Sequence, residues 1–515
     1  MTALDPKIGR FLFDTITKGL YDNPLCVFRE YIQNAADAID KAIISEEITP
    51  EEAKINIEID PTPPQPKIIF EDNGSGLSTD DAEKVLSSVG ETTKFGQRNR
   101  GFRGIGRLGG MAYCNEIFFR TKARGESKDT INRWNCRKMA EMLNPNNQNY
   151  RGLDLQEVIR QCASFEIVPS QRNQKEGFFK VEMHGVQCAR NILIDVVEVR
   201  KYLSQVAPVP FDYQNFPFGK EIDNQLRKEV LNYNTDKVLV NFEEVFKPYK
   251  ITVRLSKNKT DVITGIVPLE ILDNSGKIIG RGWRAEREEL LGAILRSDGV
   301  DGIRVRVGNI LIGDNDLLDK VFSQERFNAY FIGEIHAVDP GLIPNSRRDD
   351  FEDSEIREIF YDKIKDSLGE PLSKIVQKRS SENAKIKVIN KSKEAYVNIK
   401  EDKKIGFVSD SHRSGAIKDL RSYKDELFSL TKSRILDTKA RGEAESNIQK
   451  IDDLLSEINQ DKETIICSLS SAYSHAEKEL IGRVFNHLYN NYSKAKDPVK
   501  LTKLIVQKLN AERKK

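Results

Sequence analysis

The sequence has few cysteines and histidines, and none stands at the spacing of a metal site. Its six cysteines are scattered from position 26 to position 467 without any C-x-x-C pair, and it has five histidines. Because zinc sites need closely paired ligands, we predict no structural metal. The start, MTALDPKIGRF, lacks the apolar segment of a signal peptide. We therefore expect a reduced chain in the cytoplasm.

Long apolar runs and a net charge are also missing. No run approaches the roughly 18 apolar residues of a membrane-spanning helix, so we expect no membrane partner. Lys plus Arg number 81 and Asp plus Glu number 79, a balance that argues neither for nor against a polyanionic partner. The charge is uneven, because residues 371–515 hold 30 Lys plus Arg and 20 Asp plus Glu. The C-terminal part is therefore basic, and a length of 515 residues indicates several domains.

The stretch FREYIQNAADAIDKAI, residues 28–43, is typical of an amphipathic helix, and Pro24 suits its first position. Its apolar residues recur every three or four positions and form one stripe for a core. Glu30, Asn34 and Asp37 follow the same spacing, about 200° further round the helix. This polar row indicates either a solvated surface or a ligand site, and one helix alone does not separate the two.

Paired strands follow this helix. Residues 54–60 (KINIEID) alternate apolar and polar side chains, and residues 67–72 (KIIFED) are typical of a second short strand. A short helix, a glycine-rich segment and further strand-like runs continue to about residue 195. This order of elements predicts an α+β domain.

A second α/β region follows, and then the composition changes. Strand-like runs recur up to residue 375, and residues 286–296 are predicted to be helical. Beyond this point, apolar seams indicate long helices that form a hairpin, an oligomerisation arm or both, and residues 384–412 are interpreted as a linker. The expected domains are residues 1–195, 196–245 (a helical connector), 246–375 (α/β) and 376–515 (helical and basic).

Three short motifs stand in order within the first domain. They are E-x-x-x-N-A-x-D-A at residues 30–38, D-x-G-x-G at residues 72–76 and G-x-x-G-x-G at residues 101–106. Each alone has an ordinary explanation, since Asn, Gly and Ser favour turns and a dinucleotide fingerprint would follow a strand. Together they resemble the ATP-binding domain of the GHKL superfamily, which contains gyrase, the ninety-kilodalton heat-shock chaperones, histidine kinases and MutL. The resemblance implies a Bergerat-type ATP-binding sandwich, a mixed sheet covered by helices, that binds ATP and Mg²⁺.

The resemblance also implies roles for individual residues. Asp72 would accept a hydrogen bond from the exocyclic amine of adenine, while Gly74 and Gly76 would let the backbone approach the ring. Glu30 would orient and deprotonate the attacking water, and Asn34 would bind Mg²⁺. Asp37 is expected in a supporting position of the ATP-binding site. The residues expected near the phosphates are Lys94, Gly101, Phe102, Arg103, Gly104, Ile105 and Gly106.

Longer segments are similar to the chaperone branch of the superfamily. The first helix of that branch is similar to the segment GLYDNPLCVFREYIQNAADAIDK, and its lid is similar to SSVGETTKFG. The segment GFRG, in contrast, is what MutL-like proteins carry. EIHAVDPGLIPNSRRDDFEDS, residues 334–354, resembles a middle-domain segment whose arginine contacts the terminal phosphate of ATP. The match gives Arg347, with Arg348 as the alternative because the register slips by one. A planar, permanently charged guanidinium suits a terminal phosphate.

The likeness covers roughly the first 375 residues and has departures. The lid is short, Phe178 replaces the threonine of the glycine-threonine pair expected near Gly177, and an M-E-E-V-D tail is missing. Two functions therefore stay open for this ATPase. In the first, ATP closes a homodimeric clamp that remodels or holds a protein client. In the second, a MutL-like or MORC-like clamp, of the kind found in prokaryotic anti-phage systems, contacts nucleic acid through the basic C-terminal region.

Overall fold

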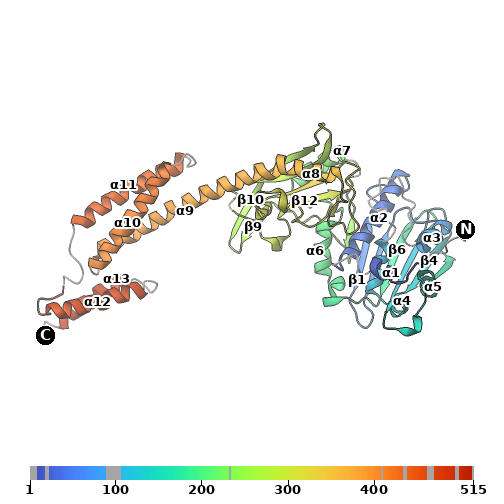
Figure 1. Ribbon diagram of the computed structural model, residues 1–515, viewed down its shortest axis with the longest axis horizontal. Helices are drawn as coiled ribbons and strands as arrows, with labels where there is room; N and C mark the ends of the chain where they lie inside the picture. Colours follow the sequence, from blue (N-terminus) through green and yellow to red (C-terminus); the bar gives the residue numbers. More distant parts are fainter. Residues whose placement is uncertain are drawn as a thin grey trace, which may run out of the picture. The chain divides into compact units, whose positions relative to one another are not determined.

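The structure, a computed structural model, divides into two compact units, Met1–Ser373 and Lys374–Lys515. The first unit contains two sheets with their covering helices, and the second is helical (Figure 1). This architecture confirms the predicted α+β class. The structure describes residues 8–17, 23–88, 106–230, 233–290, 292–407, 410–432, 438–460, 469–492 and 498–512.

The larger sheet is mixed and, counted over the described residues, has eight strands in the order β5-β4-β3-β6-β2-β1-β7-β8. Neighbouring strands are antiparallel except β1 and β7, which run parallel. Both strands predicted after the first helix form, and they pair with each other. The bounds are β1 (Ile55–Asp60), β2 (Lys67–Asp72), β3 (Glu116–Lys122), β4 (Lys128–Asn135), β5 (Ala163–Pro169), β6 (Phe178–His184), β7 (Val238–Val240) and β8 (Glu243–Glu244).

Helix α2 (Cys26–Ile44) packs its apolar stripe on the inner face of this sheet. Phe28 and Ile39 are fully buried, and the ring of Phe28 lies 5.1 Å from that of Phe70 on β2. The helix begins two residues after Pro24, because the amides of Cys26 and Val27 first close a turn with the carbonyls before them. The other helices of this region are α1 (Phe11–Thr17), α3 (Thr79–Ser87), η1 (Gly106–Tyr113), α4 (Cys136–Leu143), η2 (Gln148–Tyr150), α5 (Leu155–Cys162) and η3 (Ala189–Ile194).

The segment expected to be a helical connector is partly strand. It contains α6 (Val196–Val206) and α7 (Gly219–Glu229), but β7 and β8 also belong to it and complete the first sheet beyond β1. The side chain of Asn241 extends this pairing, since it accepts from Ile59 N at 2.7 Å and donates to Ile59 O at 3.1 Å. The first sheet is therefore built from residues on both sides of position 195.

The second sheet has the order β13-β12-β14-β11-β10-β9, counted over the described part of the chain. The prediction of a helix over residues 286–296 is wrong, because β11 runs to Arg287 and neither residues 288–290 nor residues 292–296 form an α-helix. Asp261 anchors this segment by accepting from the amides of Glu289 and Leu290, and it pairs with Arg287 at 2.8 Å. The elements are β9 (Thr252–Ser256), β10 (Lys259–Leu272), β11 (Ile278–Arg287), η4 (Arg296–Asp298), β12 (Gly302–Val307), β13 (Ile310–Ile312), η5 (Asp319–Val321), η6 (Glu325–Tyr330), β14 (Ile332–Ala337), α8 (Glu355–Ile364) and η7 (Lys365–Gly369).

A buried charge network joins the second sheet to α6. Glu334 on β14 pairs with Lys247 Nζ at 2.6 Å and with Arg306 Nε at 2.7 Å, and all three side chains are fully buried. Arg306 also donates to the carbonyl of Gln205 on α6 at 2.8 Å. Burial opposes ionisation of Glu334, but the charges of Arg306 and Lys247 outweigh it and hold the Glu334 pKa well below its usual range.

The second unit consists of long helices. The interpretation of residues 384–412 as a linker is wrong, since α9 continues through most of them as one helix (Figure 1). The apolar seams pack within the chain, where Leu420 and Leu427 of α10 share a core with Ile451 and Leu454 of α11. No helix in the described residues combines the length and the apolar composition that a membrane span requires. The helices are α9 (Glu370–Ile405), α10 (Asp410–Thr431), α11 (Thr438–Gln460), α12 (His475–Tyr492) and α13 (Pro498–Glu512).

Candidate active site

The polar row of α2 lies in three different environments. Glu30 is buried, with 8% of its surface exposed, whereas Asn34 is exposed and Asp37 is half-buried. A solvated helix face would expose all three side chains. Because a carboxylate that loses its water is costly unless nearby charges compensate it, the neighbours of Glu30 decide what it does.

Two arginines lie beside Glu30. Arg29 Nε and Arg348 Nε stand 3.7 and 3.9 Å from Glu30 Oε1. Arg29 also donates from Nη2 to the carbonyl oxygen of Arg347 at 2.9 Å. Although Glu30 Oε1 is buried, it accepts no hydrogen bond from the described residues. This carboxylate oxygen therefore keeps its acceptor capacity for a water molecule or a substrate group.

Arg348 reaches Glu30 from the loop that follows β14. Its carbonyl accepts from Gly313 N at 2.8 Å, which fixes the loop against the end of β13. Its φ of +58° is rare for a residue with a side chain and has an energetic cost. This turn buries the side chain of Arg348, whereas that of Arg347 is exposed. Of the two arginines that the sequence left open, Arg348 is therefore the one beside Glu30.

Asp72 ends β2 on the inner face of the first sheet. It is 5% exposed, and its Oδ1 accepts from Gly74 N at 3.0 Å. Burial raises the pKa of Asp72 to about 8. A donor from a ligand, such as an exocyclic amine, would favour the ionised form of this carboxyl. The position fits the predicted contact with adenine.

The loop after Asp72 is closely packed and needs its glycines. A Cβ on Gly74 would stand 2.6 Å from the carbonyl carbon of Ala38, and one on Gly76 would stand 2.1 Å from Lys122 O. Gly76 also has a φ of +61°, a region that glycine enters at little cost. Because Ser75 N donates to Ala38 O at 3.1 Å, this loop is tied directly to α2. The predicted adenine and catalytic segments are thus held together.

The glycine-rich segment is described only at its end. Gly106 begins η1, and a Cβ placed on it would stand 2.4 Å from Glu30 Oε2. The backbone of the third motif thus lies directly against the carboxylate of the first. Six residues predicted to bind ATP lie outside the described residues, namely Lys94, Gly101, Phe102, Arg103, Gly104 and Ile105.

Sequence reasoning missed Arg29 and Thr121. Arg29 stands directly before Glu30, and the carbonyl to which it donates belongs to a loop more than 300 residues away, so no local pattern indicated its role. Thr121 is fully buried, accepts from Leu77 N at 2.9 Å and donates to Phe178 O at 2.9 Å. It ties the loop after Asp72 to β6. A threonine on β3 thus lies where the expected glycine-threonine pair is missing.

The residues present fit ATP and Mg²⁺. Asp72 is a buried acceptor, Gly106 brings its backbone against the carboxylate of Glu30, and Asn34 presents a neutral amide of the kind that Mg²⁺ accepts as a ligand. The described residues contain no group of three or more His, Cys, Asp or Glu side chains that could hold a metal ion. A Mg²⁺ bound mainly through phosphates and water would not need such a group.

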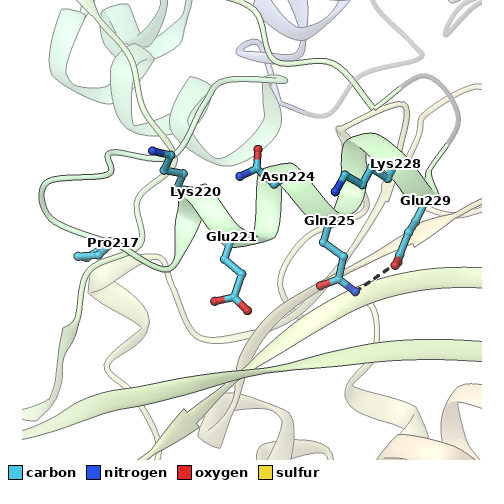
Figure 2. Close-up of a pocket in the computed structure, with 7 residues that line it drawn as sticks. All are labelled: Pro217, Lys220, Glu221, Asn224, Gln225, Lys228 and Glu229. Carbon is cyan, nitrogen blue, oxygen red and sulfur yellow. Dashed lines mark hydrogen bonds between the residues drawn. The ribbon is translucent and has the colours of Figure 1, made fainter.

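A surface depression lies apart from these residues, along the connector helix α7 (Figure 2). Apart from Pro217, its lining residues are charged or polar, and Gln225 donates a hydrogen bond to Glu229 at 3.3 Å. None of the residues predicted for the ATP site contributes to it. Its lining residues are Pro217, Lys220, Glu221, Asn224, Gln225, Lys228 and Glu229.

A protein family and a curated chaperone each match part of the chain. Residues 24–167 match the family described as histidine kinase-, DNA gyrase B-, and HSP90-like ATPase. The chaperone protein HtpG of Shewanella loihica is 22% identical over 183 residues, which cover 32% of this chain and 27% of HtpG. The chain thus spans about a quarter of the length of this relative. These matches confirm the resemblance to the GHKL superfamily and to its chaperone branch.

Proposed function

We propose that this chain, whose N-terminal part is an ATPase domain of the GHKL type, hydrolyses ATP in a reaction that depends on Mg²⁺. One observation carries the proposal. The buried carboxylate of Glu30 lies between the backbone of Gly106 and the guanidinium of Arg348. A general base, a phosphate-binding backbone and a phosphate-sensing cation are the three groups that hydrolysis of a terminal phosphate needs.

Each residue of the site has a separate role in this proposal. Asp72 binds the adenine amine, and the loop through Gly74 and Gly76 approaches the ring. The amide of Gly106, at the start of η1, faces the phosphates. Glu30 Oε1 accepts the proton of the attacking water, because this buried carboxylate oxygen accepts no hydrogen bond from the described residues. Asn34 holds Mg²⁺, which neutralises charge on the phosphates when it is bound.

Arg348 makes the site depend on two parts of the first unit. Glu30 belongs to α2 on the first sheet, whereas Arg348 belongs to the loop after β14 of the second sheet. A terminal phosphate that attracts Arg348 would favour the arrangement in which these two parts meet. ATP drives closure only through such a difference in affinity between states. We propose an ATP-driven clamp on this basis.

The clamp acts on a protein partner and works as a homodimer in the cytoplasm. Support comes from the likeness to a chaperone. Light scattering of the full chain with and without a nonhydrolysable ATP analogue tests the assembly. A mass that stays that of the monomer under both conditions would contradict the homodimer.

Binding of ATP to Asp72→Asn tests the nucleotide assignment. The amide replaces one acceptor oxygen by a donor, which would face the donor amine of adenine. Calorimetry should detect no ATP binding by this variant at concentrations that saturate the native chain. Asp60→Asn is the matched control, because Asp60 ends the neighbouring strand β1 and is exposed. Affinity retained by Asp72→Asn would overturn the adenine contact.

A further inference from the structure

The first part of α9 is strongly basic. Between residues 374 and 393 the sequence has seven Lys or Arg and a single acidic residue, Glu382. At 1.5 Å per residue, this segment is about 30 Å long. Such an excess of positive charge on one rod attracts polyanions over several ångströms. The cations are Lys374, Lys378, Arg379, Lys385, Lys387, Lys391 and Lys393.

Ion pairs offset only part of this charge. Arg379 pairs with Glu382 at 3.4 Å, and Lys393 pairs with Glu443 of α11 at 2.7 Å. The side chains of both pairs are partly or largely exposed, so the pairs contribute little and leave their cations accessible. Four of the other cations are exposed, namely Lys374, Lys378, Lys387 and Lys391.

Helix α11 brings two more cations to the same segment. The pairs Lys393–Glu443 and Lys403–Glu457 show that α9 and α11 run parallel, because both residues of the second pair lie further toward the C-terminus of their helices than those of the first. The beginning of α11 therefore lies beside the basic segment of α9. Its first turn contributes Lys439 and Arg441.

The basic excess ends before the end of α9. Residues 394–404 contain three cations and three acidic residues, and Lys403 pairs with Glu457 of α11. This balanced part is the ordinary solvated surface of a helix. The contrast within one helix shows that the positive charge is concentrated at residues 374–393.

The arrangement of these cations does not suit a lipid surface. The exposed large apolar residues of the segment, Ile375 and Ile386, lie three turns apart, and Arg379 and Glu382 lie between them on the same side. A helix that lies in a membrane interface needs a continuous apolar face. This segment therefore has charge for phosphates but no face for acyl chains.

The four exposed lysines occupy two sides of the helix. Lys374 and Lys378 lie on one side, and Lys387 and Lys391 lie about 220° further round. Two rows of cations on one rod match two rows of phosphates, such as those that border the major groove of a duplex, which is wide enough to admit a helix. Exposed Ser380 and Asn390 add groups that donate to phosphate oxygens. We propose that residues 374–393 of α9 bind the phosphate backbone of duplex nucleic acid.

This proposal goes beyond the ATPase function and is independent of it. Binding is measured by fluorescence anisotropy with a labelled 20-base-pair DNA and no nucleotide, over a range of salt concentrations. We expect K374E/K378E/K391E to bind about 10²-fold more weakly than the native chain at 0.1 M salt. The slope of log affinity against log salt should fall by about 3, because three phosphate contacts are lost. Duplex RNA should bind more weakly than DNA, because the narrow major groove of an A-form helix does not admit a protein helix.

The control K404E/K418E/K450E makes the same change in charge at exposed positions of the second unit. It should retain affinity and salt slope within about twofold, and circular dichroism should show the same helix content in all three chains. Equal losses in both variants would overturn the assignment to α9. Binding to anionic vesicles or to polyglutamate as tight as that to duplex would also overturn it. Native duplex binding by Glu30→Ala would keep this result separate from any failure of hydrolysis.

Discussion

The two units of the chain use charge in opposite ways. In the first unit, Glu30 and Glu334 are buried and lie within 4 Å of arginines that come from distant segments. In the second unit, the cations of α9 are mostly exposed, and the pairs Arg379–Glu382 and Lys393–Glu443 are themselves partly exposed. Buried charges fix a geometry, because losing a partner leaves an uncompensated ion. Exposed charges attract a polyanion without fixing its position.

The largest effect is expected from Glu30→Ala. Removal of the proposed general base should lower the rate of ATP hydrolysis by about 10² to 10⁴, because the attacking water loses its proton acceptor. Phosphate release measures the rate, and calorimetry should still detect ATP binding. Glu58→Ala, at an exposed position of β1, should leave the rate unchanged. Loss of binding together with turnover would instead assign Glu30 a structural role.

A smaller effect, on stability, separates the buried and exposed ion pairs. Glu334→Gln should lower the free energy of unfolding of the first unit by about 3 to 5 kcal/mol, since Lys247 and Arg306 would stay buried without their anion. Asp452→Asn breaks the partly exposed pair with Lys424 in the second unit and should cost at most about 1 kcal/mol. Calorimetric melting of the full chain measures both transitions. Equal costs would contradict the contrast between the units.

The smallest effect concerns pH. Because burial raises the pKa of Asp72 to about 8, the free protein holds a proton there that ATP binding should release. Affinity for ATP should therefore rise about tenfold per unit between pH 6 and pH 8 and level off above. The folded carboxyl keeps its proton where the unfolded one has lost it, so Asp72 lowers stability as pH rises from about 4 to 8.

Calorimetry in buffers of different ionisation enthalpy counts the protons released on binding. We expect close to one proton per ATP at pH 6.5 and close to none at pH 9. Asp60→Asn should keep this profile, because Asp60 is exposed. A native affinity that does not change with pH would show that Asp72 does not bind ATP as a carboxylate.

Local sequence patterns were sufficient to predict the first helix and the two strands that follow it. The apolar stripe of residues 28–43 and the alternation of KINIEID depend on burial against one sheet, which periodicity reports directly. Residues 286–296 have a helical pattern, but the amides of Glu289 and Leu290 donate hydrogen bonds to Asp261. Such a contact between distant segments is invisible to a local pattern.

In the candidate site, too, local spacing could be predicted from the sequence, whereas contacts between distant segments could not. The row of Glu30, Asn34 and Asp37 could be read from spacing, but the burial of Glu30 alone among the three could not. That burial depends on Arg348, more than 300 residues away, and on a left-handed turn that exposes Arg347. The neighbouring arginines have nearly the same sequence context, so only the turn distinguishes them.

The most direct test of the account compares Arg348→Ala with Arg347→Ala in the full chain, with kcat for ATP hydrolysis as the measurement. Loss of the guanidinium beside Glu30 should lower kcat by about 10² to 10³, while loss of the exposed neighbour should change it less than about threefold. The two substitutions are matched in type and position. A large loss in Arg347→Ala with little change in Arg348→Ala would contradict the claim that the loop after β14 completes the active site through Arg348.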